Sequence, residues 1–132
     1  MPGIRETMAL VAALTLVASG ARGGEPQFSP TLDKCLEKAG GVTTAMVDCI
    51  GTETKVQDKR LNDAYKAATA KLTPARQKEL QAVQRLWLQF RDANCKFAFD
   101  PDGGTMAHVE STGCVMSMTA ERAQELEAIA ER

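Results

Sequence analysis

The sequence predicts an all-α fold: an antiparallel helical hairpin with a short helix on its N-terminal side, a third long helix after it, and two disulfides as staples. Apolar residues recur at three- and four-residue steps along three long segments, and no stretch shows sustained two-residue alternation. Breaks that contain glycine or proline separate these segments. With 132 residues, 44% of them hydrophobic and 25% charged, the chain has the size and composition of one globular domain.

The N-terminus has the pattern of a secretory signal peptide. Arg5 precedes an apolar or small run over residues 8–19, and small residues follow as far as Ala21. The run is shorter than the roughly 20 residues that a bilayer span requires. We expect cleavage near Ala21 and no membrane insertion of the remaining chain. A buried N-terminal helix is the alternative.

The chain divides into three parts. We expect a signal peptide over residues 1–21, a flexible lead-in over residues 22–30, and a single disulfide-bonded helical domain over residues 31–132. The lead-in contains two glycines and two prolines, which disfavour regular structure. No cysteine precedes Cys35, which argues against a lipid-anchored form. These features predict a soluble periplasmic or secreted protein.

Capping and helix-breaking residues delimit the first two helices. A short helix is expected from Thr31 to a Gly40-Gly41 stop, and a long helix follows from Thr43 or Thr44. This long helix is amphipathic, and the residues that recur along it at three- and four-residue steps are Ile50, Thr54, Gln57, Leu61, Ala64, Tyr65, Ala68 and Leu72.

Thr73-Pro74 ends this helix and starts the next, because Thr is a good N-cap and Pro suits the first helical position. The stripe of this second long helix is Leu80, Val83, Trp87, Phe90, Asn94 and Phe97. The turn sequence Asp100-Pro-Asp-Gly-Gly stops it. The last helix is expected to start near Ser111 or Thr112 and carries Val115, Met118, Arg122, Leu126 and Ile129.

The short connection at Thr73-Pro74 requires the two long helices to pack antiparallel. We therefore expect a core across the hairpin that consists of Leu61, Tyr65, Ala68, Leu80, Val83, Trp87 and Phe90. Cys49 and Cys95 fall at the same end of this hairpin. Geometry there allows either a Cys49–Cys95 bridge or two local bridges.

Four cysteines in an exported chain are typical of a disulfide framework, and they permit three connectivities. Their spacings are 14, 46 and 19 residues. A four-cysteine zinc site favours short Cys-x-x-Cys pairs, so we expect no metal site.

The composition argues against nucleic-acid binding and against an enzyme. A net charge of −1 leaves no broad basic footprint for nucleic acid. His108 is the single histidine, it lies in a glycine-rich segment, and oxidised cysteines offer no nucleophile. Asp100 and Asp102 belong to a turn, where aspartate has a conformational role. We expect no catalytic residue and no cofactor.

Copper binding is a minor alternative. Met106, His108, Met116 and Met118 gather soft donors within 13 positions, and such donors suit Cu(I). However, Met116 and Met118 are two residues apart on a predicted helix, so they face different directions.

The second long helix carries a more specific pattern, Gln84-x-x-Trp87 followed by Arg91-Asp92 and then Cys95. The pattern continues at Cys35, Cys49, Glu53, Leu61, Asn62, Tyr65, Cys114, Arg122 and Leu126. Over roughly residues 31–127 the chain resembles the LprI-type lysozyme inhibitor family of small exported helical proteins. The resemblance implies two local bridges, Cys35–Cys49 and Cys95–Cys114, and a lysozyme as the protein partner.

We interpret the shared residues as mainly structural. Tyr65 and Trp87 are expected to pack in the hairpin. Arg91 and Asp92 are expected to pair beside a disulfide, and Glu53 to pair with Arg91. The structural signature is Glu53, Leu61, Tyr65, Trp87, Arg91, Asp92 and Arg122.

Function is then expected on a surface that this signature supports. The segment from Lys96 to Gly113 is expected to be an exposed loop with a net charge of −2, held at both ends. Its candidate partner-binding residues are Asp100, Asp102, His108 and Glu110. An acidic loop suits a cationic lysozyme, whose active site it would occlude. The alternative is a periplasmic binding or chaperone-like module for a peptide or envelope protein. The sequence gives no oligomeric state.

Overall fold

The protein is described by a computed structural model over residues 24–132. Its helices are α1 (Pro30–Ala39), α2 (Thr43–Ala70), α3 (Pro74–Phe97) and α4 (Met106–Ala130). Residues 24–132 contain no strand, so the predicted all-α class is confirmed. The predicted signal peptide lies outside the described residues. In the described part of the chain, no helix is long and apolar enough to cross a membrane.

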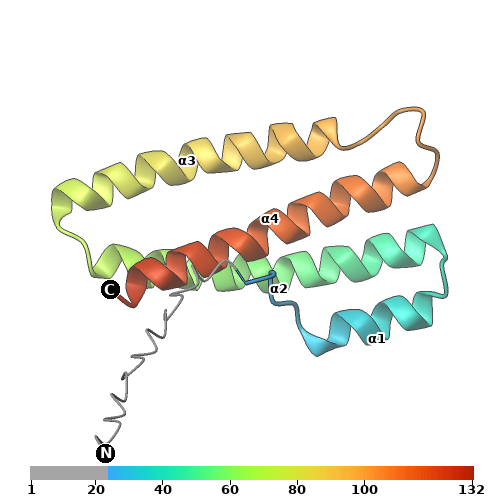
Figure 1. The fold of residues 1–132 in the computed structure, drawn as a ribbon, viewed down its shortest axis with the longest axis horizontal. Coiled ribbons are helices and arrows are strands. Elements are labelled where there is room, and N and C mark those ends of the chain that lie inside the picture. Colours follow the sequence, from blue (N-terminus) through green and yellow to red (C-terminus); the bar gives the residue numbers. More distant parts are fainter. Residues whose placement is uncertain (1–23) are drawn as a thin grey trace, which may run out of the picture.

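The long helices lie side by side along the length of the molecule. In Figure 1, α2 and α4 run in the same direction, α3 runs back against both, and α1 lies along the first part of α2. Helices α2 and α3 are consecutive and antiparallel, as a hairpin requires. However, α4 packs along α2 and provides most of the contacts of α3. The expected core across the α2–α3 hairpin therefore forms only near the Thr73-Pro74 turn, where Leu61, Ala68 and Leu80 share one cluster with α4.

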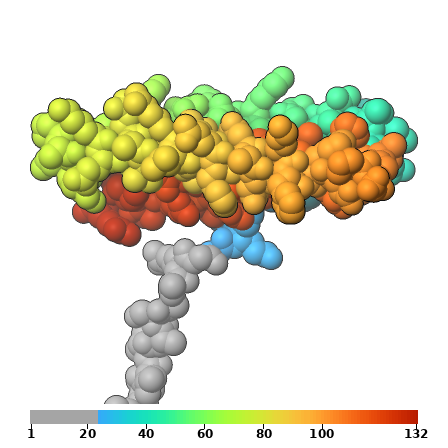
Figure 2. All heavy atoms as spheres, turned by 90° about the horizontal axis from the view of Figure 1, so that it is seen from above, coloured from blue at the N-terminus to red at the C-terminus, as the bar shows by residue number. Residues whose placement is uncertain are grey.

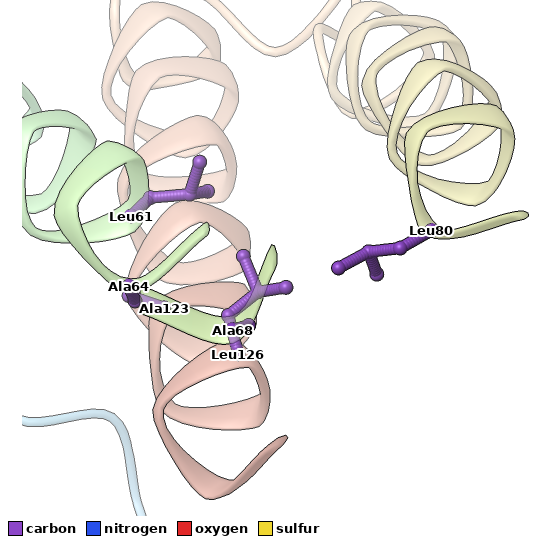
Figure 3. Close-up of a cluster of buried hydrophobic side chains, with 6 residues drawn as sticks. All are labelled: Leu61, Ala64, Ala68, Leu80, Ala123 and Leu126. Carbon is purple, nitrogen blue, oxygen red and sulfur yellow. The ribbon is translucent and has the colours of Figure 1, made fainter. Parts of the chain in front are cut away.

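The main core lies where α2, α3 and α4 meet near the Thr73-Pro74 turn. It consists of Leu61, Ala64, Ala68, Leu80, Ala123 and Leu126, as Figure 3 shows. Alanines at the α2–α4 contact lack bulky side chains, which allows these two helices to approach closely. Tyr65 and Trp87 pack against this cluster and are partly buried.

Two residues of the expected core lie outside it. Val83 is 49% exposed and Phe90 is 61% exposed. The predicted stripe of α3 includes both residues. However, α4 covers only the side of α3 that carries Leu80, Gln84 and Cys95. The remaining apolar residues of α3 face outward.

A second apolar cluster holds α1 and the lead-in against α2 and α4. It consists of Leu32, Cys49, Ile50 and Met116, with Phe28 and Leu36 packed against it. Residues 24–29 have no regular structure, yet Phe28 is partly buried. The carbonyl oxygen of Gln27 accepts a hydrogen bond from Gln57 Nε2 at 3.1 Å. The described part of the lead-in is thus docked on α2.

Two of the predicted capping residues cap helices, Gly40 and Thr73, whereas the N-cap of α2 is Val42 and the helix starts at Thr43. Gly40 ends α1 with a φ of 57°, a left-handed conformation that glycine adopts without a steric penalty. Thr73 caps α3 through a hydrogen bond from the Arg76 amide. The N-cap of α1 is Ser29 instead of Thr31, because Pro30 takes the first helical position.

The start of α4 was wrongly predicted. The helix begins at Met106, five residues before Ser111. Ser, Thr and Gly at positions 111–113 are weak helix formers, which made this stretch resemble a loop. Tertiary contacts override that preference: Ala107 is buried, and Ser111 Oγ donates to the Cys95 carbonyl oxygen at 2.8 Å.

Candidate functional site

Polar signature residues join α3 to α4. The guanidinium carbons of Arg91 and Arg122 lie 5.3 and 6.0 Å from the centroid of the Trp87 ring, within the range of a cation–π contact. Arg122 Nε donates to Gln84 Oε1 at 3.0 Å, and both side chains are buried. Arg91 Nη1 donates to Thr119 Oγ1 at 3.3 Å. These contacts give Gln84, Trp87, Arg91 and Arg122 a packing role.

The expected pair of Arg91 and Asp92 is present, with 2.8 Å between Arg91 Nη2 and Asp92 Oδ1. The expected pairing of Glu53 with Arg91 is wrong. Glu53, on α2, instead meets the segment before α1. Its carboxylate accepts hydrogen bonds from the Ser29 amide at 2.9 Å and from the Ser29 hydroxyl. Gln57 Nε2 also donates to it, at 2.7 Å. Glu53 therefore fastens the lead-in to α2.

The environment of Glu53 keeps it ionised. Burial of this side chain, which is 2% exposed, acts to raise the pKa of its carboxyl group. The hydrogen bonds from the Ser29 side chain, the Gln57 side chain and the Ser29 backbone outweigh burial, so the pKa lies below its ordinary value of 4.5. A buried ionised carboxylate with this many donors is a structural anchor.

The two disulfides are Cys35–Cys49 and Cys95–Cys114, which confirms the local pairing that the family resemblance implied. The first joins α1 to α2, and the second joins the end of α3 to α4. The segment between Cys95 and Cys114 is only partly a loop, because residues 98–105 alone connect the two helices. The predicted loop over residues 96–113 is therefore shorter than expected.

The candidate partner-binding residues occupy two elements at this end of the molecule, and all four are exposed. Asp100 and Asp102 share the loop, where Asp100 Oδ1 accepts a hydrogen bond from the Asp102 amide at 2.9 Å. His108 and Glu110 lie on the first turns of α4. The His108 ring meets the Phe99 ring edge-on, with 4.9 Å between centroids, and so lies against the loop. Among residues 24–132, no side-chain hydrogen bond or ion pair joins Glu110 to the loop.

Sequence reasoning missed the apolar neighbours of these acidic residues. Phe97 is 89% exposed at the end of α3. Beside it lies an open hollow of about 760 Å³, lined by Lys96, Phe97, Phe99 and Pro101 among others. The Phe-Ala-Phe run directly before the turn was the available signal, since aromatic side chains at a chain reversal are hard to bury. Rings beside carboxylates give this end of the molecule both apolar and acidic contact groups.

The soft donors considered for copper do not form one group. Met116 packs in the cluster of Leu32 and Ile50, toward α1 and α2. Met118 Sδ instead lies 3.6 Å from Cys95 Sγ, toward α3. Within residues 24–132, no group of three His, Cys, Asp or Glu side chains is placed to hold a metal ion.

The fold and these contacts define an all-α domain with two local disulfides, in which polar residues of the Gln84-x-x-Trp87 pattern join α3 to α4. The family model of the lysozyme inhibitor LprI matches residues 35–126, and the chain belongs to this family. Uncharacterized protein R02472 of Rhizobium meliloti (strain 1021) is 29% identical over 98 residues, which span 63% of this chain and 70% of that relative. No solved structure matches the chain. The LprI family is one of non-catalytic inhibitors, which supports the expectation that this chain is not an enzyme.

Proposed function

We propose that this protein is exported and binds a lysozyme, and that it covers the active-site cleft of that enzyme. The match of the LprI lysozyme inhibitor model over residues 35–126 carries this proposal, because it spans both disulfides, the whole of α2 and α3, and most of α4. The predicted signal peptide and the export-associated disulfides support action outside the cytoplasm.

The contact surface that we propose is the acidic end, which consists of Asp100, Asp102 and Glu110 with His108 beside them. Lysozyme is a cationic glycosidase whose cleft holds the catalytic carboxylates. From Lys96 to Gly113 this surface carries a net charge of −2, which attracts a cationic enzyme and steers its approach.

The loop at this end is held at both ends. The Cys95–Cys114 bridge and the bond from Ser111 Oγ to the Cys95 carbonyl oxygen fix its base. Thr43 Oγ1 and Thr105 Oγ1 lie 3.3 Å apart and connect its far end to α2. A loop that is already ordered loses little conformational entropy on binding, which favours affinity.

An inhibition assay on lysozymes of different types, with and without the purified protein, tests the proposal. The informative variant changes Asp100→Asn, Asp102→Asn and Glu110→Gln together. We expect association to slow about tenfold, because steering by surface charge acts mainly on the association rate. The matched control changes Asp58→Asn, Glu121→Gln and Glu131→Gln, three exposed residues away from this end, and should inhibit like the native protein.

Full inhibition by the loop variant would place the contact surface elsewhere. A lack of inhibition of every lysozyme type by the native protein would overturn the proposed function. It would leave the second candidate, a periplasmic binding or chaperone-like module for a peptide or envelope protein. The open apolar hollow beside Phe97 favours that candidate, since it has room for an apolar side chain.

A further inference from the structure

The outer face of α3 carries a stripe of large apolar side chains that no other element covers. Val83, Leu86, Phe90 and Phe97 are 49%, 65%, 61% and 89% exposed. Their spacings of three, four and seven residues place them on one side of the helix. Figure 2 shows α3, in yellow and orange, extending along the whole of one face of the molecule. The exposed fractions of these side chains show that the stripe is open to solvent along its length.

Basic residues accompany this outer stripe. Helix α3 contains five basic and two acidic residues and has a net charge of +3. The other described residues contain nine basic and fourteen acidic residues, for a net charge of −5. The molecule thus carries its positive charge on the helix that also exposes its largest apolar side chains.

Three of these cations lie on a side of α3 about a quarter of a turn from Leu86 in the outer stripe. Lys78, Arg85 and Lys96 are separated by seven and eleven residues, so they share one side of α3. All three are exposed, and none forms an ion pair with another residue in the range 24–132. Arg76 and Arg91 instead pair with Glu79 and Asp92 on the same helix.

We propose that the outer face of α3 docks this protein on an anionic membrane surface. The apolar stripe enters the boundary between headgroups and acyl chains, and Lys78, Arg85 and Lys96 contact the lipid phosphates. Phe and Leu on one side of a helix with Lys and Arg at its edge is the pattern of helices that lie in the membrane interface. The proposal does not depend on lysozyme inhibition.

A second copy of the chain fits this face less well. If two copies packed through their α3 helices, the basic residues of one copy would lie near those of the other and repel them. From Val83 to Phe97 the stripe is about 21 Å long on a helix about 10 Å wide. That projected area, on the order of 200 Å², is well below the roughly 800 Å² per partner of a stable protein interface.

Flotation with lipid vesicles tests the proposal on the protein recovered from the exported fraction of cells. Vesicles of equal parts phosphatidylglycerol and phosphatidylcholine are compared with vesicles of phosphatidylcholine alone. We expect binding to the anionic vesicles and at least about tenfold weaker binding by Leu86→Gln/Phe90→Gln, which removes the centre of the stripe. Lys78→Gln/Arg85→Gln/Lys96→Gln should weaken anionic binding by about a hundredfold, since each basic residue near such a surface contributes about fivefold.

Val56→Gln is the matched control, because Val56 is 46% exposed on α2 and lies outside the stripe. Every variant keeps the same N-terminus, so a difference between variants isolates α3, and helical circular dichroism verifies that each is folded. Equal vesicle binding by native protein and Leu86→Gln/Phe90→Gln would overturn the proposal, as would no binding to anionic vesicles. A native dimer that this double variant dissociates, without vesicle binding, would assign the face to a second copy.

Discussion

Glu53 shows how one buried charge organises the N-terminal side of the fold. Its carboxylate is almost fully enclosed, yet Ser29 and Gln57 supply donors to it. Hydrogen bonds to a charged group contribute about 1.5–3 kcal/mol, more than those between neutral groups. Loss of the charge would leave these donors with a weaker acceptor and loosen the lead-in where it meets α2.

The free energy of unfolding should therefore depend on the ionisation of Glu53. Its pKa in the folded state lies below the ordinary value of 4.5, so the carboxylate stabilises the fold above that pH. This contribution is lost as pH falls through the lower, folded-state pKa. Glu53→Gln should unfold more easily at neutral pH by about 1–3 kcal/mol, and the difference from native protein should shrink in acid.

Thermal unfolding of both proteins from neutral pH to about pH 3 measures this effect. Glu37→Gln serves as the control, because Glu37 is an exposed carboxylate on α1 that accepts no side-chain hydrogen bond from the described residues. A difference between Glu53→Gln and native protein that stays constant down to acid pH would show that Glu53 acts by its shape instead of its charge.

At the scale of elements, each disulfide fastens one helix that has little core of its own. Helix α1 contributes one buried side chain, Leu32, and α3 contributes Leu80, Gln84 and Cys95. Helices α2 and α4 share the larger buried surface and carry most of the cluster in Figure 3. The bridges therefore tie the weakly packed helices to the strongly packed pair.

Removal of the Cys95–Cys114 bridge by Cys95→Ser/Cys114→Ser should lower the free energy of unfolding by about 3 kcal/mol, the chain-entropy value for a loop of this size. Helicity should persist, because the α2–α4 pair remains packed. Limited proteolysis should then cut within residues 98–105 sooner than in native protein. Cys35→Ser/Cys49→Ser is the control, and it should leave cleavage at that loop unchanged; an equal increase in both variants would mean that the bridges act only through global stability.

Local signals predicted the helices well, while packing partners were harder to predict. Gly40-Gly41 and Thr73-Pro74 act through backbone geometry that the sequence specifies directly, so the breaks were predicted correctly. The choice of α4 instead of α2 as the main neighbour of α3 depends on how three helices share space, which periodicity does not encode. Phe90 illustrates this, since its spacing fits the core stripe although α4 lies on another side of the helix.

The candidate site was predicted in part for the same reason. Asp100 and Asp102 were placed in an exposed turn by composition, and the structure places them there. Glu110 was assigned to that loop but lies on α4, because burial of Ala107 and the bond of Ser111 stabilise two helical turns of low propensity. Phe97 is exposed because the packing of α4 against α3 does not extend to this residue. No local sequence pattern reveals how far that packing extends.

At the scale of the whole molecule, positive and negative charge occupy different surfaces. Helix α3 has a net charge of +3, and residues 98–113, which follow it, have a net charge of −3. Exposed charges act over about 8 Å at physiological ionic strength, which is shorter than the length of α3. A cationic enzyme and an anionic membrane would therefore approach different parts of the same molecule.

This separation predicts that substitutions on one proposed surface leave the activity of the other surface unchanged. Leu86→Gln/Phe90→Gln should lose vesicle binding while its inhibition of lysozyme stays within about twofold of the native value, since distant sites combine additively. Asp100→Asn/Asp102→Asn/Glu110→Gln should associate with lysozyme about tenfold more slowly and bind anionic vesicles no more weakly than native protein, because it removes only negative charge. Both activities should fall as salt rises, because salt screens the attraction of the acidic residues to a cationic lysozyme and of the basic residues to anionic lipids. If instead either variant lost both activities while its melting temperature stayed native, one continuous surface around Phe97 would serve both partners, and the division of charge would have no functional meaning.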